Sequence, residues 1–434
     1  MKKRETWNSQ TGFILASLGA AIGLGNLWLF PWRFATYGGG SFLIPYLIFL
    51  FIFVRLGLTA EIAFGRAFKK GPVGSFKKAM PEKYKKLPSA LGTLPGIALF
   101  CILSFYLVVS GWIASYIYIY IFKSNTLNQS THFFHSFAGS IYTIPGLIIV
   151  LALISITLIF GINKGIEKCN SIVMPLFFIM LLVLFIASMS LGTSAKTFKY
   201  MFTFSWDQLL NINTWVMALG QSFFTVCLGG MLTYGSYLKR NTNIPKAAFF
   251  TVFFNMVASL LATLVIIPAV FRFNLDMNSG PALLFLTIPK ICSLFTGGYY
   301  FGLLFFIAAF LAAFSSAINL MEVAVETLIN LLRINRMISV FIITILLFII
   351  SIILTLDMNL FTSWTNIVSV YFYPLIPLII QVIFFWFNKK KDAFDEINHG
   401  ANRPLRRTSK IILKYIFPPI CTLVIILGIV YGGL

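Results

Sequence analysis

The chain has 434 residues, of which 59% are hydrophobic and only 10% are charged. A soluble domain carries about 25% charged residues, so this composition excludes a soluble fold and predicts a polytopic membrane protein built of helices in lipid. The net charge of +21 would suit a nucleic-acid-binding protein. The basic residues, however, lie in short loops between apolar segments, which is a signal of membrane topology, so we expect no nucleic-acid partner.

The sequence offers no chemistry for an enzyme at membrane depth. Its five cysteines lie in or beside apolar segments without the spacing of a metal site, and its three histidines lie in predicted loops. We therefore expect no catalytic residue. The basic start, residues 1–4, runs into an apolar segment that lacks a small-residue cleavage site, so we expect the first helix to be retained.

The first apolar segment, residues 11–36, contains the most informative stretch of the chain. Residues 19–31 read GAAIGLGNLWLFP, and each of the three glycines lowers helix stability by about 1 kcal/mol relative to alanine. Unpaired backbone groups are unfavourable in hydrocarbon, so a helix weakened here is expected to use its freed carbonyls and amides for binding. The stretch predicts a helix broken in mid-membrane that coordinates an ion and a small solute.

Ten further segments are long enough to cross a bilayer, at roughly 20 residues each. They are residues 41–66, 89–122, 141–160, 170–191, 211–238, 246–271, 298–332, 337–356, 363–388 and 411–433. Basic residues gather in alternate loops, which places the N-terminus in the cytoplasm and the C-terminus outside; we expect the bacterial inner membrane. Residues 281–292 are apolar but too short to span, and we expect an external loop helix or a re-entrant hairpin there.

The sixth segment resembles the first in its pattern of glycines. Residues 220–237 read GQSFFTVCLGGMLTYGSY, in which paired glycines interrupt an apolar run. The starts of the two broken helices are five spans apart, which is the spacing of two five-helix halves with opposite topology, because an odd number of spans forces the inversion. We therefore divide one transmembrane domain, residues 1–434, into a first inverted repeat (11–196), a second inverted repeat (211–388) and an additional helix (411–433).

Motifs along nearly the whole chain resemble the neurotransmitter:sodium symporter family. They include RETW at 4–7, GLGNLWLFPW at 23–32, YGGG at 37–40, LSFY at 103–106, GQSFFT at 220–225 and LTYGSY at 232–237. The resemblance implies the LeuT fold, an all-α integral membrane inverted repeat of 5+5 transmembrane helices with broken helices 1 and 6, plus an eleventh helix as in a prokaryotic branch. It also implies a secondary active transporter that couples sodium to symport by alternating access.

The resemblance implies two sodium sites built from neutral oxygens, which suit a hard cation. The first maps onto the substrate carboxylate and onto Ala21, Asn26, Thr225 and Asn255. The second maps onto the carbonyls of Gly19, Ile22 and Ala312 and the hydroxyls of Ser315 and Ser316. Read without the family, the asparagines could instead form interhelical hydrogen bonds and the serines could bond to their own helix.

The resemblance places the substrate carboxylate at the amides of Leu24 and Gly25, where a half-helix N-terminus favours anions, with Tyr106 donating to it. Gly23 stands where amine transporters carry an aspartate, which favours an amino acid over a monoamine. The other implied substrate positions are Ala21, Ile102, Phe224, Thr225, Cys227, Ser316 and Leu320. Most are apolar, so we expect a neutral, hydrophobic or aromatic amino acid. Residues 227–233 are expected to be unwound.

A chloride site is a further implication of the resemblance. In chloride-dependent relatives it maps onto Tyr46, Gln221, Thr225, Asn255 and Ser259. The seventh span contains no carboxylate between Lys246 and Arg272, so this neutral cage could take an anion that balances sodium. The alternative is that these side chains form interhelical hydrogen bonds and bind no anion.

Both gates depart from the family pattern. Leu29 occupies the position of the external gate arginine, and residues 363–387 contain no acid, so we expect an apolar external gate with Phe224 and Tyr106 as its lid. Internally Arg4 and Trp7 remain. The aspartate position in the eighth span reads Asn330, which leaves Glu326 or Glu322 as partners. Glu61, an acid inside the membrane, is expected to accept hydrogen bonds from freed amides at the helix breaks.

Two other functions stay open at this point. A proton-coupled or ion-independent amino-acid transporter on the same fold would work without sodium, although the paired hydroxyls of Ser315 and Ser316 argue against it. A non-transporting amino-acid sensor would bind its ligand without flux, but such proteins usually carry a soluble signalling domain, which we do not find. In each case the expected partners are a small amino acid and the lipid bilayer.

Overall fold

The computed structural model describes residues 4–123, 130–223, 229–273, 283–388 and 392–431, and every regular element in these ranges is a helix. Within them, nine helical spans are long and apolar enough to cross a membrane, and a bent helix pair forms a tenth crossing. The bent pair consists of α1 (Gln10–Ala21) and the run of η1 (Gly25–Leu29) and α2 (Phe30–Thr36), which meet at 60°.

The nine continuous spans follow the predicted order. They are built from α3 (Gly40–Ile48), η2 (Phe49–Val54) and α4 (Arg55–Phe68); α6 (Leu87–Phe122); η5 (Ile141–Thr143) and α8 (Ile144–Ile159); η6 (Ile162–Glu167) and α9 (Lys168–Met189); α14 (Ile244–Phe273); α16 (Gly298–Leu332); α17 (Arg336–Leu356); α18 (Met358–Ile367), η8 (Val368–Phe372), α19 (Tyr373–Val382) and η9 (Ile383–Phe387); and α21 (Arg407–Ile411), η10 (Ile412–Ile416) and α22 (Phe417–Tyr431). Ten of the eleven predicted crossings are thereby confirmed as helical spans.

The remaining predicted crossing, residues 211–238, is present as two pieces. These are α12 (Ile212–Phe223) and α13 (Gly230–Gly235), and residues 224–228 between them lie outside the described part of the chain. The expectation that residues 227–233 are unwound is wrong for residues 230–233, which belong to α13. The physical reason is a carboxylate from α4 that accepts a hydrogen bond from an amide near the start of α13.

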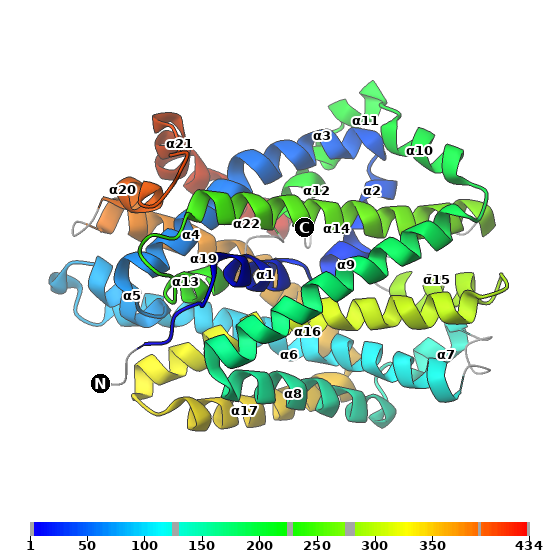
Figure 1. The fold of residues 1–434 in the computed structure, drawn as a ribbon, viewed down its shortest axis with the longest axis horizontal. Coiled ribbons are helices and arrows are strands. Elements are labelled where there is room, and N and C mark those ends of the chain that lie inside the picture. Colours follow the sequence, from blue (N-terminus) through cyan, green and yellow to red (C-terminus); the bar gives the residue numbers. More distant parts are fainter. Residues whose placement is uncertain (1–3, 124–129, 224–228, 274–282, 389–391, 432–434) are drawn as a thin grey trace.

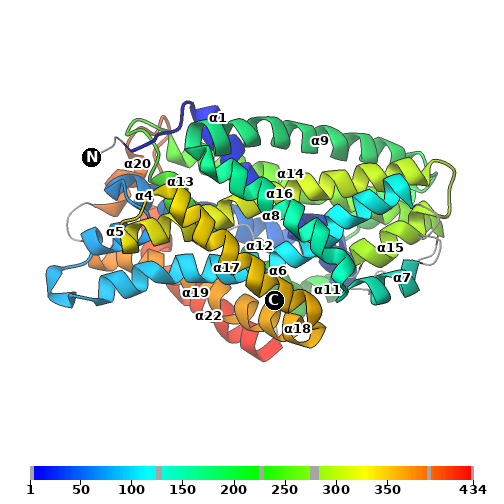
Figure 2. The ribbon, with the colours of Figure 1, turned by 90° about the horizontal axis from the view of Figure 1, so that it is seen from below.

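The spans form a bundle with two long antiparallel helices, α6 and α16, packed side by side. In Figure 1, α8 and α17 run along one edge of the bundle next to them, and α1, α9 and α14 lie on the other side. The N-terminus lies at the same end as the short helices α5 (Pro72–Ala79) and α20 (Ala393–Asn398), and Figure 2 shows the same grouping from below. The pseudo-twofold relation between residues 11–196 and 211–388 stays a prediction.

The first helix is fixed to its neighbours at its N-terminal end. Ser9 caps α1 by accepting a hydrogen bond from the Gly12 amide at 2.8 Å. The carboxylate of Glu167 accepts from the amides of Asn8 and Ser9 at 2.8 and 3.2 Å. In return, Glu5 accepts from the Ile162 amide at 2.6 Å. The broken helix is therefore held against the start of the fifth span before it reaches its break.

Glycines allow α4 and α13 to pack with their backbones almost in contact. A β-carbon on Gly65 would lie 1.9 Å from the Leu232 carbonyl oxygen, and one on Gly235 would lie 2.2 Å from the Ile62 carbonyl oxygen. Neither position tolerates a side chain without moving a helix. This close packing brings Glu61, one turn before Gly65, to the first residues of α13.

Residues 283–292 of the predicted segment 281–292 are helical, and the choice between a loop helix and a re-entrant hairpin stays open, because residues 274–282 lie outside the described part of the chain. The described part is α15 (Leu283–Cys292), which packs beside α7 (Ser130–Phe137) and α16. Figure 1 places it at the end of the bundle opposite the N-terminus, with α7, α10 (Ser194–Phe202) and α11 (Trp206–Leu210).

Candidate substrate and ion site

The first helix breaks where its glycines predict. Ile22 ends α1 in an extended conformation, with φ −88° and ψ 109°, and the chain resumes as the π-helical segment η1 at Gly25. Asn26 stabilises the interruption, because its Oδ1 accepts a hydrogen bond from the Gly23 amide at 3.1 Å. The break therefore leaves backbone carbonyls and amides near the middle of the bundle, available for a ligand.

Two of the residues expected at the first sodium site meet in the structure. Asn26 donates through Nδ2 to Oδ1 of Asn255 at 2.9 Å and to Oγ of Ser259 at 2.8 Å. All three side chains are at least nine-tenths buried. Every oxygen here is neutral, as is the nearby backbone of Ala21 at the end of α1, so the donor set fits a hard monovalent cation. Thr225 lies outside the described residues.

The residues expected at the second sodium site also lie together. A β-carbon on Gly19 would lie 3.1 Å from Cβ of Ser315, which shows how closely α1 approaches α16. Ser315 donates to the Ala312 carbonyl at 3.0 Å, the local bond that the alternative interpretation predicted. Ser316 donates instead across the helices to the Ala20 carbonyl at 3.5 Å. The Ala20 carbonyl was not among the expected ligands. It lies two residues before Ile22, an expected ligand that caps the C-terminal end of α1.

The expected carboxylate site is formed by a tyrosine facing the break. The Leu24 amide donates to the Tyr106 hydroxyl at 3.2 Å, and Tyr106 also forms a hydrogen bond with Ser316. A β-carbon on Gly23 would lie 3.0 Å from the Tyr106 oxygen. Any side chain at position 23 would therefore press against the Tyr106 hydroxyl and Ser316. The Gly25 amide opens η1 directly after them.

Part of the expected side-chain subsite is apolar, as predicted. Ile102 and Leu320 belong to one hydrophobic cluster between α6, α16 and the tenth span, together with Leu99, Val323 and Val368. Phe224 and Cys227, the other expected members, lie outside the described residues. The described wall of the subsite therefore offers hydrocarbon and no charge to a side chain.

Three residues of the expected chloride cage meet in the structure, Gln221 has another partner, and Thr225 lies outside the described residues. Tyr46 forms hydrogen bonds with Asn255 and Ser259, so three of the five positions of the cage meet. Gln221 instead accepts from Nη1 of Arg33 at 3.0 Å, with both side chains more than nine-tenths buried. No partner for Arg33 could be identified in the sequence. The signal that could have found this pair is an arginine inside an apolar segment, since such charges face the protein interior.

Glu61 caps the broken sixth span. Its Oε1 accepts a hydrogen bond from the Leu232 amide at 3.2 Å, and the carboxyl also faces the amides of Gly229 and Met231. Only 1% of the residue is exposed. The expectation that Glu61 bonds freed amides at a helix break is thereby confirmed for α13.

At the N-terminal end, Glu326 replaces the missing aspartate. Arg4 forms an ion pair with Glu326 at 2.8 Å, and its guanidinium stacks on the Tyr237 ring at 4.5 Å. Burial lowers the pKa of Arg4, but Tyr237 and Glu326 outweigh it and hold that pKa above its usual value. Asn330 supports the pair by donating to Glu326 at 3.0 Å.

Neighbouring residues extend this network across the bundle. Tyr237 donates to both Glu322 and Glu326, at 2.8 and 3.1 Å, and Arg336 at the start of α17 pairs with Glu322. Trp7 donates through its indole to the Tyr234 carbonyl at 2.9 Å. Of the two partners that the sequence left open for Arg4, the structure selects Glu326 and gives Glu322 to Arg336.

Aromatic residues pack together at the opposite end, where the sequence predicts an apolar gate. Phe285 of α15 packs edge-on against Trp28 and Trp112, with ring centroids 6.5 and 5.6 Å apart. Tyr116 donates to the Phe285 carbonyl at 3.3 Å. The expected lid named Tyr106 and Phe224 and missed Phe285, because no spacing in the sequence indicates which short helix folds back over the first span.

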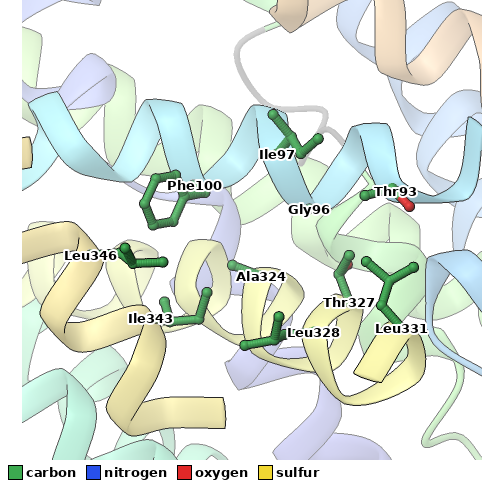
Figure 3. A pocket seen from close by; sticks show the side chains of 10 residues that line it. All are labelled: Thr93, Gly96, Ile97, Phe100, Ala324, Thr327, Leu328, Leu331, Ile343 and Leu346. Carbon is green, nitrogen blue, oxygen red and sulfur yellow. The ribbon is translucent and has the colours of Figure 1, made fainter. Parts of the chain in front are cut away.

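A separate groove on the outer side of the bundle does not resemble this site. It has a volume of about 180 Å³ and is lined by α6, α16 and α17, with two threonines as its only polar residues. Figure 3 shows Phe100, Leu328 and Ile343 facing it from the three helices. A ligand site normally combines apolar walls with a few converging polar groups. That combination occurs at the helix break and not in this groove.

Comparisons with known proteins agree with this geometry. A sequence profile for the Sodium:neurotransmitter symporter family matches residues 4–139 and 129–432. An uncharacterized sodium-dependent transporter of Bacillus subtilis, YhdH, is 33% identical over 337 residues, which cover 75% of this chain and 73% of that one. A relative with the same description from Methanocaldococcus jannaschii is 29% identical over 98% of this chain and 90% of its own. The crystal structure of MhsT in complex with L-phenylalanine superposes with a TM-score of 0.85 at 30% identity, covering 98% of this chain and all of MhsT.

Proposed function

Because the chain belongs to the sodium:neurotransmitter symporter family, as a sodium-dependent membrane transporter with the LeuT fold and not an enzyme, we propose that it carries a neutral, hydrophobic or aromatic amino acid together with sodium. One observation carries the proposal. The Leu24 amide donates to the Tyr106 hydroxyl at 3.2 Å at the helix break, beside Gly23, which places no side chain against these groups.

In this proposal the substrate carboxylate replaces the hydrogen bond between the Leu24 amide and the Tyr106 hydroxyl and accepts from both groups. The amides that begin the run from Gly25 to Thr36 are not used within the helix and carry the positive end of its dipole, which favours an anion. Tyr106 adds a second donor from α6. The substrate's amino group is then held by backbone carbonyls near Ala21, since position 23 has no carboxylate to bind it.

The substrate's side chain lies against hydrocarbon. Ile102 and Leu320 form an uncharged wall, which favours burial of an apolar side chain by roughly 25 cal/mol per Å². MhsT, which shares 30% of its residues with this chain, was crystallised with L-phenylalanine. Both facts support phenylalanine and similar amino acids as the first substrates to test.

Coupling follows from shared ligands. Two sodium ions bind neutral oxygens around the break, the first near Asn26 and Asn255 and the second near Ser315 and Ser316. The first site takes its negative charge from the substrate carboxylate. Each ion also fixes the interrupted backbone that holds the substrate, so ion and amino acid raise each other's affinity.

Chloride balances part of the sodium charge in this proposal. Tyr46, Asn255 and Ser259 are neutral and mutually bonded, and the described residues of the seventh span add no carboxylate between Lys246 and Arg272. Arg33 brings a positive charge to the neighbouring Gln221 at 3.0 Å. A cation next to a neutral cage makes the region more favourable for an anion.

The two ends form the gates of an alternating-access cycle. We place the Arg4–Glu326 end in the cytoplasm of a bacterial inner membrane, because basic residues gather in the loops at that end. The Phe285 cluster then faces outside. Rocking of spans 1, 2, 6 and 7 against spans 3, 4, 8 and 9 opens one end at a time.

The test is uptake of labelled amino acids into proteoliposomes that contain the purified protein. We expect accumulation of a hydrophobic or aromatic amino acid with an inward sodium gradient, no accumulation when potassium replaces sodium, and a further loss when gluconate replaces chloride. Uptake that is indifferent to sodium would contradict the ion coupling and favour a proton-coupled or ion-independent transporter. Saturable binding without flux would favour a sensor.

A further inference from the structure

Asn170 is a buried polar residue that neither the expected sites nor the family motifs include. It lies on α9, has no exposed surface, and faces α1 at Gly19. Its Oδ1 would lie 2.0 Å from a β-carbon on Gly19. An asparagine at this depth is unfavourable unless its amide is used.

The orientation of the amide is fixed by one of its own hydrogen bonds. Nδ2 donates to the Ile166 carbonyl one turn back, at 2.9 Å. A flipped amide would place Oδ1 against that carbonyl, oxygen against oxygen, so the flipped state is excluded. The oxygen of Asn170 therefore points toward α1.

Of the two polar atoms of the Asn170 amide, Nδ2 has a hydrogen-bond partner, and Oδ1 has none among the described residues. Among the residues that the structure describes, nothing donates to Oδ1 of Asn170, and water has no access to this buried atom. A buried acceptor without a donor is destabilising by about 1–3 kcal/mol. A group that binds only when the transporter is loaded would remove this penalty.

The oxygen lies beside the second sodium site. The point that a Gly19 β-carbon would occupy is 2.0 Å from Oδ1 of Asn170 and 3.1 Å from Cβ of Ser315. Gly19 and Ser315 are both positions at which we propose ligands for this ion. The missing β-carbon allows α9 to approach, so an oxygen from a third helix lies close to Gly19 on α1 and to Ser315 on α16.

We propose that Asn170 supplies a further oxygen to the sodium ion that this site takes. The inference rests on the proposed sodium coupling and adds a residue of the fifth span to it. Sodium suits the position because a cation needs an acceptor without a competing proton donor, and Oδ1 is such an acceptor. The bond of Nδ2 to Ile166 keeps the oxygen in place before the ion arrives.

The experiment is a sodium titration of the thermal unfolding of the purified full-length protein, in choline-balanced buffer without amino acid. Sodium raises the unfolding midpoint of the wild type as it binds. We expect Asn170→Leu, which keeps the branching at Cγ and removes the oxygen, to raise the half-maximal sodium concentration about three- to tenfold, as for the loss of one polar contact. Asn170→Asp retains an oxygen and is expected to remain closer to the wild type.

Ser171→Ala is the matched control, because its hydroxyl bonds only its own helix at Glu167 and its loss should leave the sodium titration unchanged. A half-maximal concentration for Asn170→Leu within about twofold of the wild type, a difference smaller than one polar contact, would overturn the inference, even if the midpoint in choline fell. A wild type without any sodium response would contradict the proposed function instead. The two failures are therefore distinguishable.

Discussion

At the scale of single residues, the site is defined by polar atoms that the fold brings to one helix break. Leu24 and Tyr106 are far apart in the sequence yet form a hydrogen bond, and Asn26 and Asn255 do the same across η1 and α14. Each of these residues could be proposed from the sequence because a motif surrounds it. Arg33 and Asn170 could not be assigned, since their partners depend on how separate helices pack.

Removing the Tyr106 hydroxyl should weaken substrate binding. We expect Tyr106→Phe to raise the dissociation constant of the transported amino acid at least about tenfold, since a hydrogen bond to a charged group contributes about 1.5–3 kcal/mol. Equilibrium binding of the labelled amino acid to purified protein measures this. Tyr118→Phe is the control, because Tyr118 lies on the same helix and is 52% exposed. Equal losses in both variants would contradict the role of Tyr106.

The Arg4–Glu326 pair gives a second prediction at this scale. Glu326→Gln leaves a largely buried guanidinium without its carboxylate, which is destabilising for the closed state, so we expect a lower rate of sodium-driven uptake. Asn330 lies 3.0 Å from the Glu326 carboxylate. The double variant Glu326→Gln with Asn330→Asp should therefore recover uptake.

Failure of Asn330→Asp to recover any uptake in the Glu326→Gln background would show that Arg4 needs its carboxylate at position 326 itself. Glu82→Gln is the control for this series. Glu82 is an exposed acid at the same end of the bundle, on η3 (Glu82–Tyr84), and its loss should leave uptake unchanged.

At the scale of elements, the interrupted helices are held from outside rather than by their own sequence. Glu167 binds the start of α1, and Glu61 binds the start of α13. The expected unwinding of residues 230–233 was wrong for this reason, because a sequence pattern of glycines does not show which amides a distant carboxylate will cap. The short helix α15 illustrates the same limit, since its composition indicated a short element but not its place over the first span.

Packing of α4 on α13 can be tested with one methyl group. Gly65→Ala places a β-carbon 1.9 Å from the Leu232 carbonyl oxygen, which forces the helices apart and removes Glu61 from its amides. We expect a lower unfolding midpoint, from a destabilisation of about 1–3 kcal/mol, and loss of transport. Gly428→Ala on α22 is the control, because its nearest neighbour lies 3.6 Å away. An unchanged midpoint for Gly65→Ala would contradict the close packing.

At the scale of the whole molecule, different kinds of contact hold the two ends of the bundle, which we propose as the gates. Ion pairs through Arg4, Glu326, Glu322 and Arg336 hold one end, and aromatic packing around Phe285 holds the other. The strength of an ion pair in a low-dielectric interior falls when water enters, whereas the strength of aromatic packing follows the area that is buried. The two gates therefore respond to different conditions, which suits a cycle in which only one opens at a time.

Charge balance across the cycle gives the last prediction. If chloride neutralises part of the sodium charge, Ser259→Glu supplies a fixed negative charge beside Asn26 and Tyr46. We expect uptake by this variant to persist when gluconate replaces chloride, while wild-type uptake falls. Ser259→Ala, which adds no charge, should stay sensitive to chloride. Equal chloride sensitivity in Ser259→Glu and the wild type would contradict the anion cage.

The sequence by itself determined the class of the molecule, its crossings and the position of the first break. These follow from local quantities, namely the length of apolar segments, the placement of glycines and the distribution of basic residues. Tertiary structure alone decided which carboxylate pairs with Arg4, where α13 begins, what Gln221 bonds, and that Asn170 faces Gly19. These are contacts between helices, and their partners are selected by the approach of whole elements, which no local pattern of residues encodes.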